Sequence, residues 1–245
     1  MIGEVGSLTL NRHLKRLAAK IVDHTLRERV VSFMENPTVE ISGRSFRGLS
    51  LEDSPAGKSR HHSYSTGLVE HIRSSTEVSL ALCDIAKRIY HININRDVVT
   101  AAMLLHDIAK PLTYTEKEDQ TYGISPLGDR MDHLTLVVAE LIRRGFDLDV
   151  IHAVSAHHGY EAGPIGPRTV EALVCHIADL CDAKLSGELL RAADFLTREC
   201  GGERPLRLTT RQAFELISAK EREGCDGVRR VLENLRNRKT SERSD

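Results

Sequence analysis

An all-α fold is the first prediction from this 245-residue sequence. Apolar residues recur at helical spacing in several segments, and proline, glycine or asparagine separates one segment from the next. The central apolar run, residues 98–105, leads directly into His106 and Asp107, and Lys110 follows. A core helix does not usually need two good metal ligands at its end, so this stretch also gives the first indication of function.

The composition is that of a soluble globular protein, with 40% hydrophobic and 28% charged residues. The length suits one large domain with a sizeable core. The formal net charge is −1, so no global basic field indicates a polyanionic partner. Aromatic residues make up only 4%, which disfavours a nucleic-acid surface built on stacking rings. A small phosphate ester is compatible with this composition, because a local metal can supply positive charge.

Five cysteines are present without any CxxC pair, so neither a disulfide framework nor a thiolate zinc site is expected. The N-terminus lacks the long apolar segment of a signal peptide. No apolar run approaches the roughly 20 residues that span a bilayer. We therefore expect a cytoplasmic protein without a membrane partner.

Residues 1–57 are predicted to form a helical and irregular extension packed on the core. Residues 12–35 have helical spacing and predict one helix or a bent pair. The pattern ends before Pro37, because proline disfavours helix in the residue that precedes it. Residues 38–50 predict a small irregular segment or a β-hairpin. A loop over 51–60 then leads into the core.

Residues 58–185 are predicted to form the core. Its expected helices cover 67–89, 96–110, 132–145, 147–156 and 170–184. Asp132 is predicted to cap the third of these helices. Residues 113–129 are polar and contain glycine, which predicts a loop or a lid over substrate.

Residues 186–238 are predicted to form further helices of the same domain. The expected helices cover 188–199, 210–222 and 227–237. Adjacent glycines, Gly201 and Gly202, separate the first helix from the second. The short polar tail, residues 239–245, is predicted to be disordered.

Histidine and aspartate side chains occur on five of the expected helices or at their ends. The candidate metal ligands are His71, His106, Asp107, His133, His157 and Asp179. Imidazole and carboxylate ligands without cysteine suit iron, manganese, cobalt, nickel or zinc better than calcium. A divalent ion held in this way makes hydroxide available near neutral pH, and a pair of ions assists phosphoryl transfer. Side chains of adjacent helical residues diverge by about 100°, which suits Asp107 to a bridge between two ions.

Any one histidine is more often structural than a ligand, so the inference depends on the ordered set. At least one of His157 and His158 is expected to bind metal, and we favour His157. His176 shares a helix face with Asp179, and it either orients a ligand or packs in the core. Tyr64 is interpreted as a packing residue.

The ordered set resembles the HD-domain superfamily of metal-dependent phosphohydrolases, whose pattern is a His, a His-Asp pair, one or more further His and an Asp. The match covers roughly residues 58–185. The resemblance implies a helical bundle with a centre of two Fe(II) or Mn(II) ions, or of one. It implies that the first ion is held by His71, His106, Asp107 and Asp179. Asp107 would bridge to a second ion that is completed by His133 and by His157 or His158.

Shorter matches resemble one branch of this superfamily. They are residues 55–58 (Pro-Ala-Gly-Lys), 61–64 (His-His-Ser-Tyr), 67–71 (Gly-Leu-Val-Glu-His) and 178–184 (Ala-Asp-Leu-Cys-Asp-Ala-Lys). The branch includes bacterial 3'-5' exoribonucleases and archaeal iron(II)-dependent phosphodiesterases of pterin biosynthesis, which open 7,8-dihydroneopterin 2',3'-cyclic phosphate. The exoribonucleases usually carry an OB-type module before the HD domain. The roughly 60 residues that precede the match here are too few for a complete barrel, which favours a small substrate.

Four side chains are candidates for substrate contact. Lys110 and His62 are predicted to contact a phosphate or to stabilise charge in the transition state. With Asp107 they form the predicted catalytic set. Lys58 and Arg60 are predicted to help hold the anion. The alternative for Lys110 is a solvated helix end, where cations are favoured.

The sequence therefore predicts a metal-dependent phosphodiesterase that hydrolyses a small cyclic phosphodiester, with 7,8-dihydroneopterin 2',3'-cyclic phosphate as the leading substrate. The first alternative is a 3'-5' exoribonuclease or a nucleotide phosphohydrolase, and only this interpretation admits a nucleic-acid partner. The second is a nucleotide-binding sensor without turnover. The intact ligand set disfavours the sensor, because a pure binder has no need of every ligand. Assembly into a homo-oligomer is left open.

Overall fold

The computed structural model describes residues 10–59, 61–119, 121–201 and 207–241, with side chains described as far as residue 237. Helices dominate these residues and the strands form only two short antiparallel pairs, so the all-α prediction is confirmed. The helices are α1 (Arg12–Ala18), α2 (His24–Glu35), α3 (Gly67–Tyr90), α4 (Arg96–Leu105), α5 (Lys110–Thr113), α6 (His133–Arg143), α7 (Leu148–Ser155), α8 (Gly159–Ala162), α9 (Val170–Glu199) and α10 (Thr210–Ser241). The strands are β1 (Val39–Ile41), β2 (Arg44–Phe46), β3 (Tyr114–Glu116) and β4 (Tyr122–Ile124).

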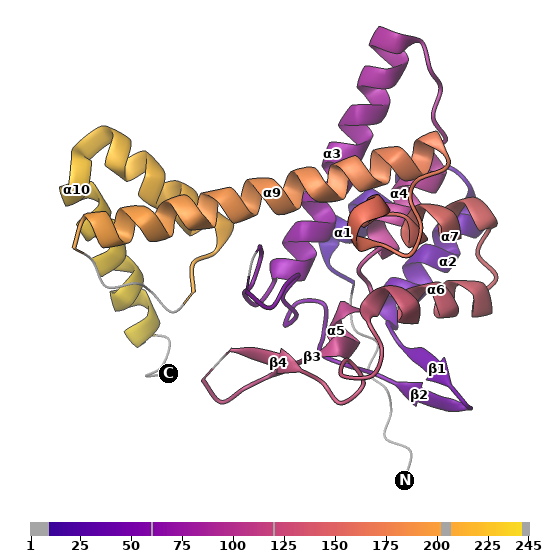
Figure 1. Cartoon of the computed structure of the whole chain (residues 1–245), viewed down its shortest axis with the longest axis horizontal. Helices are drawn as coiled ribbons and strands as arrows, with labels where there is room; N and C mark the ends of the chain where they lie inside the picture. The colour runs from indigo at the N-terminus through magenta and orange to yellow at the C-terminus, as the bar shows by residue number, and fades with distance from the viewer. Residues whose placement is uncertain (1–9, 60, 120, 202–206, 242–245) are drawn as a thin grey trace.

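The central helix of the core is α4, in which every side chain from Val98 to Leu105 is buried. It packs against α3, α7 and α9, which lie around it in Figure 1. Full burial of a leucine side chain stabilises a fold by about 1.5–3 kcal/mol, so this apolar run fixes α4 in the interior. The residues that follow α4 therefore lie inside the protein as well.

The predicted helix over 96–110 is too long, because α4 ends at Leu105. The chain then turns tightly, and the backbone N–H of Lys110 donates to the carbonyl of Asp107 at 2.9 Å. Lys110 begins α5, with Pro111 in the first turn, where a missing N–H breaks no helical bond. Apolar spacing does not reveal such a turn, because the turn itself is also buried.

Two β-hairpins accompany the helices. The pairing of Val39 with Phe46 lies within the predicted 38–50 segment, so the hairpin alternative is confirmed. The pairing of Tyr114 with Ile124 falls in a region predicted as a loop, and the loop prediction is wrong there. Strands of three residues are too short to show the alternation that marks a strand. Whether this second hairpin acts as a lid stays a prediction.

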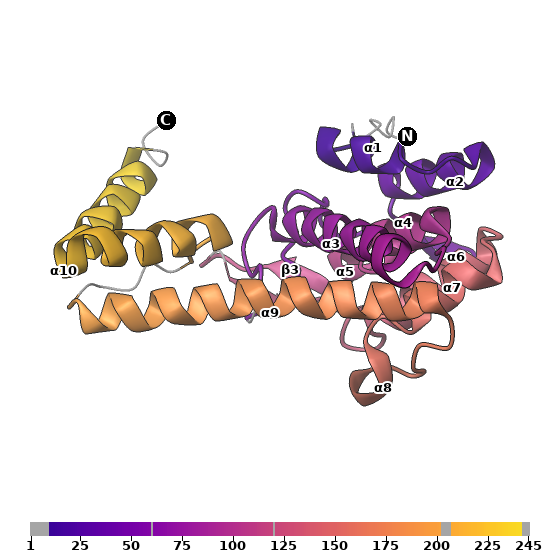
Figure 2. The same cartoon turned by 90° about the horizontal axis from the view of Figure 1, so that it is seen from above.

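The longest straight element is α9, a single helix of 30 residues where the sequence predicted two. Gly187 lies within it, in open space. A glycine in a helix interior costs only about 1 kcal/mol relative to alanine, and the packing of α9 on α3 and α10 outweighs that cost. Figure 2 shows α9 running from the core to α10, so this helix joins the two ends of the molecule.

The far end of α9 packs with α10 around a second apolar cluster. The cluster consists of Ala193, Cys200, Ala213, Leu216, Val228 and Leu232. Between its two arms α10 bends at Gly224, whose φ of 62° lies in the left-handed region that favours glycine. These arms correspond to the predicted helices at 210–222 and 227–237. The helix continues through 239–241, residues 242–245 lie outside the described residues, and the disorder of the tail stays a prediction.

The predicted boundaries at residues 57, 185 and 238 stay predictions. One apolar core draws its side chains from Leu10 to Ala178, and it includes the extension before residue 57. The second cluster is formed by α9 and α10 alone. Over the ranges that the structure describes, no helix is both long and apolar enough to cross a membrane.

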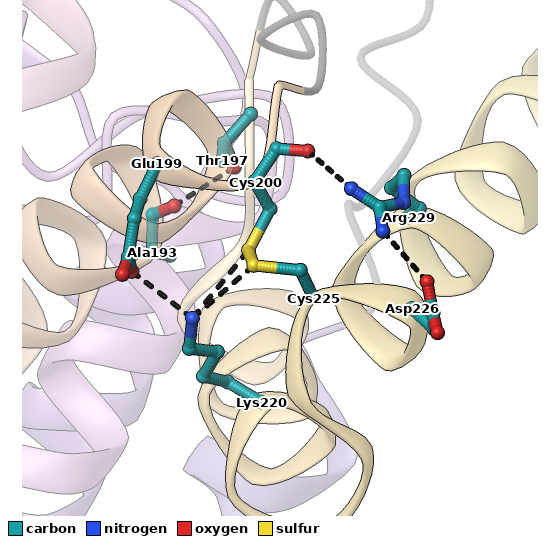
Figure 3. Close-up of a disulfide and its surroundings, with 8 residues drawn as sticks. All are labelled: Ala193, Thr197, Glu199, Cys200, Lys220, Cys225, Asp226 and Arg229. Carbon is teal, nitrogen blue, oxygen red and sulfur yellow. Dashed lines mark hydrogen bonds and ion pairs between the residues drawn. A yellow bond between two sulfur atoms is a disulfide. The ribbon is translucent and has the colours of Figure 1, made fainter.

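Cys200 and Cys225 form a disulfide that joins the end of α9 to α10 (Figure 3). The cysteine pattern predicted no disulfide framework, and it did not reveal this single disulfide. The two cysteines are 25 residues apart and are brought together by the bend of α10, which no cysteine spacing reveals. The remaining cysteines, Cys83, Cys175 and Cys181, are free.

Removal of this disulfide is expected to lower the free energy of unfolding. Cys200→Ser combined with Cys225→Ser frees a loop of 25 residues in the unfolded chain, and a loop of that size corresponds to about 3 kcal/mol. Urea unfolding of both proteins under non-reducing conditions measures the difference. Cys181→Ser, which changes an exposed free thiol, is the control and should fall within about 0.5 kcal/mol of wild type. Equal stability of the double variant and wild type would contradict this role.

Candidate metal centre

The six predicted ligands come from five parts of the fold and meet in its interior. They are His71 on α3, His106 and Asp107 after α4, His133 at the start of α6, His157 after α7 and Asp179 on α9. Their side-chain nitrogen and oxygen atoms gather in groups small enough to hold metal ions. Two such groups lie on either side of the Asp107 carboxylate.

The first group is centred on the Nε2 atom of His71. This atom lies 3.0 Å from His106 Nε2, 3.1 Å from Asp179 Oδ1 and 3.2 Å from Asp107 Oδ2. His106 Nε2 is 3.4 Å from Asp107 Oδ2. His71, His106 and Asp107 are all buried, so these atoms face one another with almost no access to bulk water.

The second group lies on the other side of Asp107. Its Oδ1 atom is 3.3 Å from His133 Nε2 and 3.8 Å from His157 Nε2. His158 also offers a nitrogen within 4.8 Å of the other ligand atoms. The two oxygens of Asp107 therefore face different groups of imidazoles. This is the arrangement expected of a carboxylate that bridges two ions.

Local structure sets the direction of the histidines in the second group. Asp132 accepts the backbone N–H of Thr135 at 2.8 Å, so the predicted N-cap is confirmed and His133 is placed in the first turn of α6. His176 donates from Nδ1 to the carbonyl of His157 at 2.8 Å. Its ring lies so close to Gly159 that a Cβ there would fall 2.4 Å from the imidazole. The glycine thus permits His176 to support the turn that carries His157.

Hydrogen bonds at Nδ1 determine which ring nitrogens are free to bind a metal. Nδ1 of His106 lies 2.8 Å from the carbonyl of Met103, and Nδ1 of His157 lies 2.7 Å from that of Val154. A carbonyl only accepts, so each Nδ1 carries the proton and each Nε2 of a neutral ring offers a lone pair. Such partners orient metal-binding histidines in known sites.

His71 is oriented in the same way, because its Nδ1 donates to Asp182 Oδ2 at 2.7 Å. In the neutral rings of His71 and His106, two bare Nε2 atoms would therefore face each other at 3.0 Å. Two lone pairs at that distance repel unless a cation lies between or beside them. A proton or a metal ion removes this repulsion.

Several buried polar atoms of the site lack hydrogen-bond partners among the described residues. They are both carboxylate oxygens of Asp107, Nε2 of His133 and Nε2 of His157. Leaving a buried polar group unsatisfied costs about 1–3 kcal/mol. Lys110 contributes an ion pair to the carboxylate, and the two imidazole nitrogens lie 3.3 and 3.8 Å from Asp107 Oδ1 without making a hydrogen bond. Buried imidazole nitrogens and carboxylate oxygens that lack hydrogen-bond partners are suitable ligand atoms for a divalent transition metal.

The charges of the site favour anionic aspartate and protonated histidine in the metal-free protein. Burial lowers the pKa of His71, but the carboxylates of Asp107, Asp179 and Asp182 outweigh burial and raise it well above its usual value. Burial also lowers the pKa of His106, but the Asp107 carboxylate raises it to about 8. Burial raises the pKa of Asp107, but Lys110 and His106 hold it well below its usual range. Metal binding must therefore release protons.

The predicted substrate residues are placed differently from one another. Lys110 is buried, with Nζ 2.5 Å from Asp107 Oδ2, so the alternative of a solvated helix end is wrong. Lys58 is exposed in the loop before α3 and, within the described part of the chain, makes no hydrogen bond or ion pair with the cluster. Arg60 lies outside the described residues. The roles of Lys58 and Arg60 stay predictions.

His62 lies behind His71 rather than beside the ligand atoms. Its Nε2 is 3.0 Å from Asp182 Oδ2, and its Nδ1 is 2.8 Å from the hydroxyl of Tyr64. Asp182 was not among the site residues predicted from the sequence. A signal was present, because Asp182 follows Asp179 by three residues and shares its helix face.

A pocket of about 830 Å³ opens beside the second group, where His133 and His158 form part of its wall. Apolar side chains supply most of the rest of the wall. They are Leu134, Val138, Ala139, Ile142, Ala162, Pro164 and Ile165. Pockets of this size accommodate ligands as large as a nucleotide or a small drug. The pocket thus adjoins the candidate reaction centre.

The family model for the HD domain matches residues 68–184. The chain is 39% identical over 188 residues to the dihydroneopterin 2',3'-cyclic phosphate phosphodiesterase of Methanocaldococcus jannaschii, which covers 77% of this chain and 75% of that protein. It is also similar to 3'-5' exoribonucleases named YhaM. The identity is 26% for the protein of Bacillus velezensis and 25% for that of Bacillus subtilis.

The two exoribonucleases are longer than the region of similarity. The matches cover 75% and 62% of this chain but only 60% and 51% of the Bacillus velezensis and Bacillus subtilis proteins. No solved structure gives a significant match to the chain. The similarity therefore extends over most of the phosphodiesterase and over little more than half of the nucleases.

Proposed function

Because this chain belongs to the HD-domain family of metal-dependent phosphohydrolases, we propose that it hydrolyses a small cyclic phosphodiester, with 7,8-dihydroneopterin 2',3'-cyclic phosphate as substrate. The observation that carries the proposal is the position of Asp107, whose two oxygens face two separate groups of imidazoles. The similarity to a phosphodiesterase named for this cyclic phosphate supports the choice of substrate.

The proposed centre has room for two divalent ions. The first would be held by His71, His106, Asp107 and Asp179, and the second by Asp107, His133 and His157. We prefer His157 to His158 because its Nδ1 is fixed by a backbone carbonyl and its Nε2 is buried without a partner. Iron(II) and manganese(II) are the proposed metals, since both suit imidazole and carboxylate ligands.

Divalent ions in this centre supply, when bound, positive charge at the phosphate and a lower pKa for water. The chain adds the ammonium group of Lys110, which is held beside Asp107 and is proposed to face the phosphate. Hydrolysis consumes one water, forms one P–O bond and breaks one ester bond of the five-membered ring. The product is a phosphomonoester with a free hydroxyl on the neighbouring carbon.

The ring system of the substrate is proposed to lie in the pocket beside His133. Its walls are mostly apolar, and the polar wall residue Asp132 already accepts hydrogen bonds from Thr135. Such a wall suits the faces of a flat heterocycle. The phosphate would then extend toward Asp107 and Lys110.

Filling the pocket is expected to discriminate between substrates with and without a ring. Ala139→Trp should raise KM for dihydroneopterin cyclic phosphate by about 10-fold, equivalent to about 1.4 kcal/mol of binding. The same variant should turn over glycerol 1,2-cyclic phosphate, which lacks the ring, within about twofold of wild type. Leu148→Trp, at a position that is 77% exposed and outside the pocket, is the control. Equal losses for both substrates would place the ring elsewhere.

The exoribonuclease is the second candidate, favoured by the similarity to the YhaM proteins. An anaerobic assay with Fe(II) or Mn(II) separates the candidates by comparing dihydroneopterin cyclic phosphate, nucleoside 2',3'-cyclic phosphates and single-stranded RNA. Rapid opening of the pterin cyclic phosphate without shortening of RNA is the expected result. Stepwise shortening of RNA from its 3' end without opening of cyclic phosphates would reject the proposed function in favour of the nuclease.

A further inference from the structure

A continuous chain of hydrogen bonds connects the start of α10 with the candidate ligand His71. The hydroxyl of Thr210 lies 2.9 Å from that of Tyr64, which lies 2.8 Å from His62 Nδ1. His62 Nε2 is 3.0 Å from Asp182 Oδ2. The same carboxylate oxygen is 2.7 Å from His71 Nδ1. The chain of hydrogen bonds thus ends on Nδ1 of His71, whereas Nε2 of the same ring faces the other ligand atoms.

The Asp182 carboxylate sets the direction of the two bonds that it makes, while the Tyr64 hydroxyl donates to Glu70 Oε2 at 2.7 Å. Asp182 only accepts, so His62 Nε2 and His71 Nδ1 both donate to it. One oxygen therefore ties the two imidazoles together and leaves the Nε2 lone pair of His71 directed at the site. At the other end, the Tyr64 oxygen also accepts the backbone N–H of Thr210 at 3.2 Å. The start of α10 is therefore bound to this tyrosine by backbone and side chain.

The chain of hydrogen bonds is buried along its central part. His62, Tyr64 and Asp182 are each 3% exposed, and His71 is fully buried. Water cannot readily replace a partner that is removed from such an environment, so each hydrogen bond restricts the next side chain. The geometry of His71 therefore depends on Asp182 and, through it, on His62 and Tyr64, which make no hydrogen bond to the candidate ligands.

The backbone around His62 is shaped for this contact. Its φ of 44° lies in the left-handed region, which is uncommon for residues other than glycine. Gly67, at the start of α3, approaches so closely that a Cβ there would lie 2.1 Å from the carbonyl oxygen of His62. Strain of this kind persists where the surrounding structure requires it, and it is typical of functional sites. The loop thus directs the His62 ring at Asp182.

We propose that Tyr64, His62 and Asp182 are positioning residues for His71, and that Thr210 connects α10 to the same chain of hydrogen bonds. Three of these four residues, His62, Tyr64 and Thr210, lie outside the region matched by the family model. The Ser186 hydroxyl on α9 lies 2.8 Å from that of Thr210 and provides a second attachment. The proposal rests on the metal site described under the proposed function, in which His71 is a ligand.

The expected effect is on metal affinity. Loss of a partner that orients a metal-binding histidine typically weakens binding by about 10–100-fold. Asp182→Asn should lie in that range, and Tyr64→Phe and Thr210→Val should weaken binding by about 10-fold or somewhat less. Because Tyr64 and Thr210 both act through His62, combining Tyr64→Phe with Thr210→Val should cost less than the sum of the two separate losses.

Anaerobic titration of each full-length protein with Co(II), followed by the visible absorption of the bound ion, measures affinity and geometry without any substrate. Tyr122→Phe and Thr197→Val are matched controls. Each removes a buried hydroxyl that donates to a backbone carbonyl and takes no part in the chain of hydrogen bonds from Thr210 to His71. Thr210→Ser keeps the hydroxyl and should restore wild-type affinity, which separates positioning from a general loss of fold. Circular dichroism verifies that all variants are folded.

Co(II) affinities of Asp182→Asn, Tyr64→Phe and Thr210→Val within twofold of wild type and of the controls would overturn the positioning role alone. A wild-type protein that binds no Co(II) would overturn both this inference and the proposed metal centre. Weaker binding with an altered visible spectrum in the three variants, but not in the controls, is the predicted result.

Discussion

Asp107→Asn is expected to reduce kcat/KM for the cyclic phosphodiester by about 1,000-fold or more, equivalent to about 4 kcal/mol of transition-state stabilisation. The two oxygens of Asp107 face His71 and His106 on one side and His133 on the other. An asparagine replaces one of these oxygens with an NH2 group that can only donate, and it removes the negative charge that a bridge between cations requires. Both metal occupancy and turnover should therefore fall together.

The measurement combines steady-state kinetics with metal content by mass spectrometry on the same preparation. Asp149→Asn is the control, because Asp149 is an exposed aspartate in the first turn of α7. It should retain wild-type activity and metal. Full metal content and activity in Asp107→Asn would contradict both the catalytic role of Asp107 and its role as a metal ligand.

Lys110→Met is expected to lower kcat by about 100- to 1,000-fold while metal is retained. The Lys110 ammonium is buried and pairs with Asp107 at 2.5 Å, so it places a positive charge where the phosphate is proposed to bind. Burial lowers the pKa of Lys110, but the Asp107 charge raises it above its usual value, so the group stays protonated. Methionine preserves much of the volume of the side chain without its charge.

Single-turnover kinetics with the metal-loaded variant measures the chemical step directly. Lys87→Met, at an exposed position on α3, is the matched control and should not change the rate. An unchanged kcat in Lys110→Met would mean that the ammonium group pairs with Asp107 but takes no part in the chemical step. A loss of metal instead of rate would assign it to the assembly of the site.

The candidate ligands could be predicted from the sequence because each follows from a local pattern. His71 lies in the first turns of a helix with clear apolar spacing, and Asp132 marks the start of the helix that carries His133. The His106-Asp107 pair directly follows the most continuous apolar run of the core. Their convergence could be anticipated only through the resemblance to a known family, since no spacing states which helices meet.

The positioning residues could not be predicted because their contacts join distant parts of the chain. Asp182 is 120 residues from His62, and Thr210 is 146 residues from Tyr64. The partner of Cys200 was missed for a similar reason, because it depends on how α10 bends at Gly224. The end of α4 was missed because the following turn is as buried as the helix.

Metal content and hydrolysis, measured together after anaerobic reconstitution with Fe(II) or Mn(II), test the central claim most directly. We expect the protein to bind a transition metal stoichiometrically and to open dihydroneopterin 2',3'-cyclic phosphate. Removal of the metal with a chelator should abolish hydrolysis, and return of Fe(II) or Mn(II) should restore it. Hydrolysis that persists in metal-free protein, or a protein that binds no transition metal, would contradict the claim.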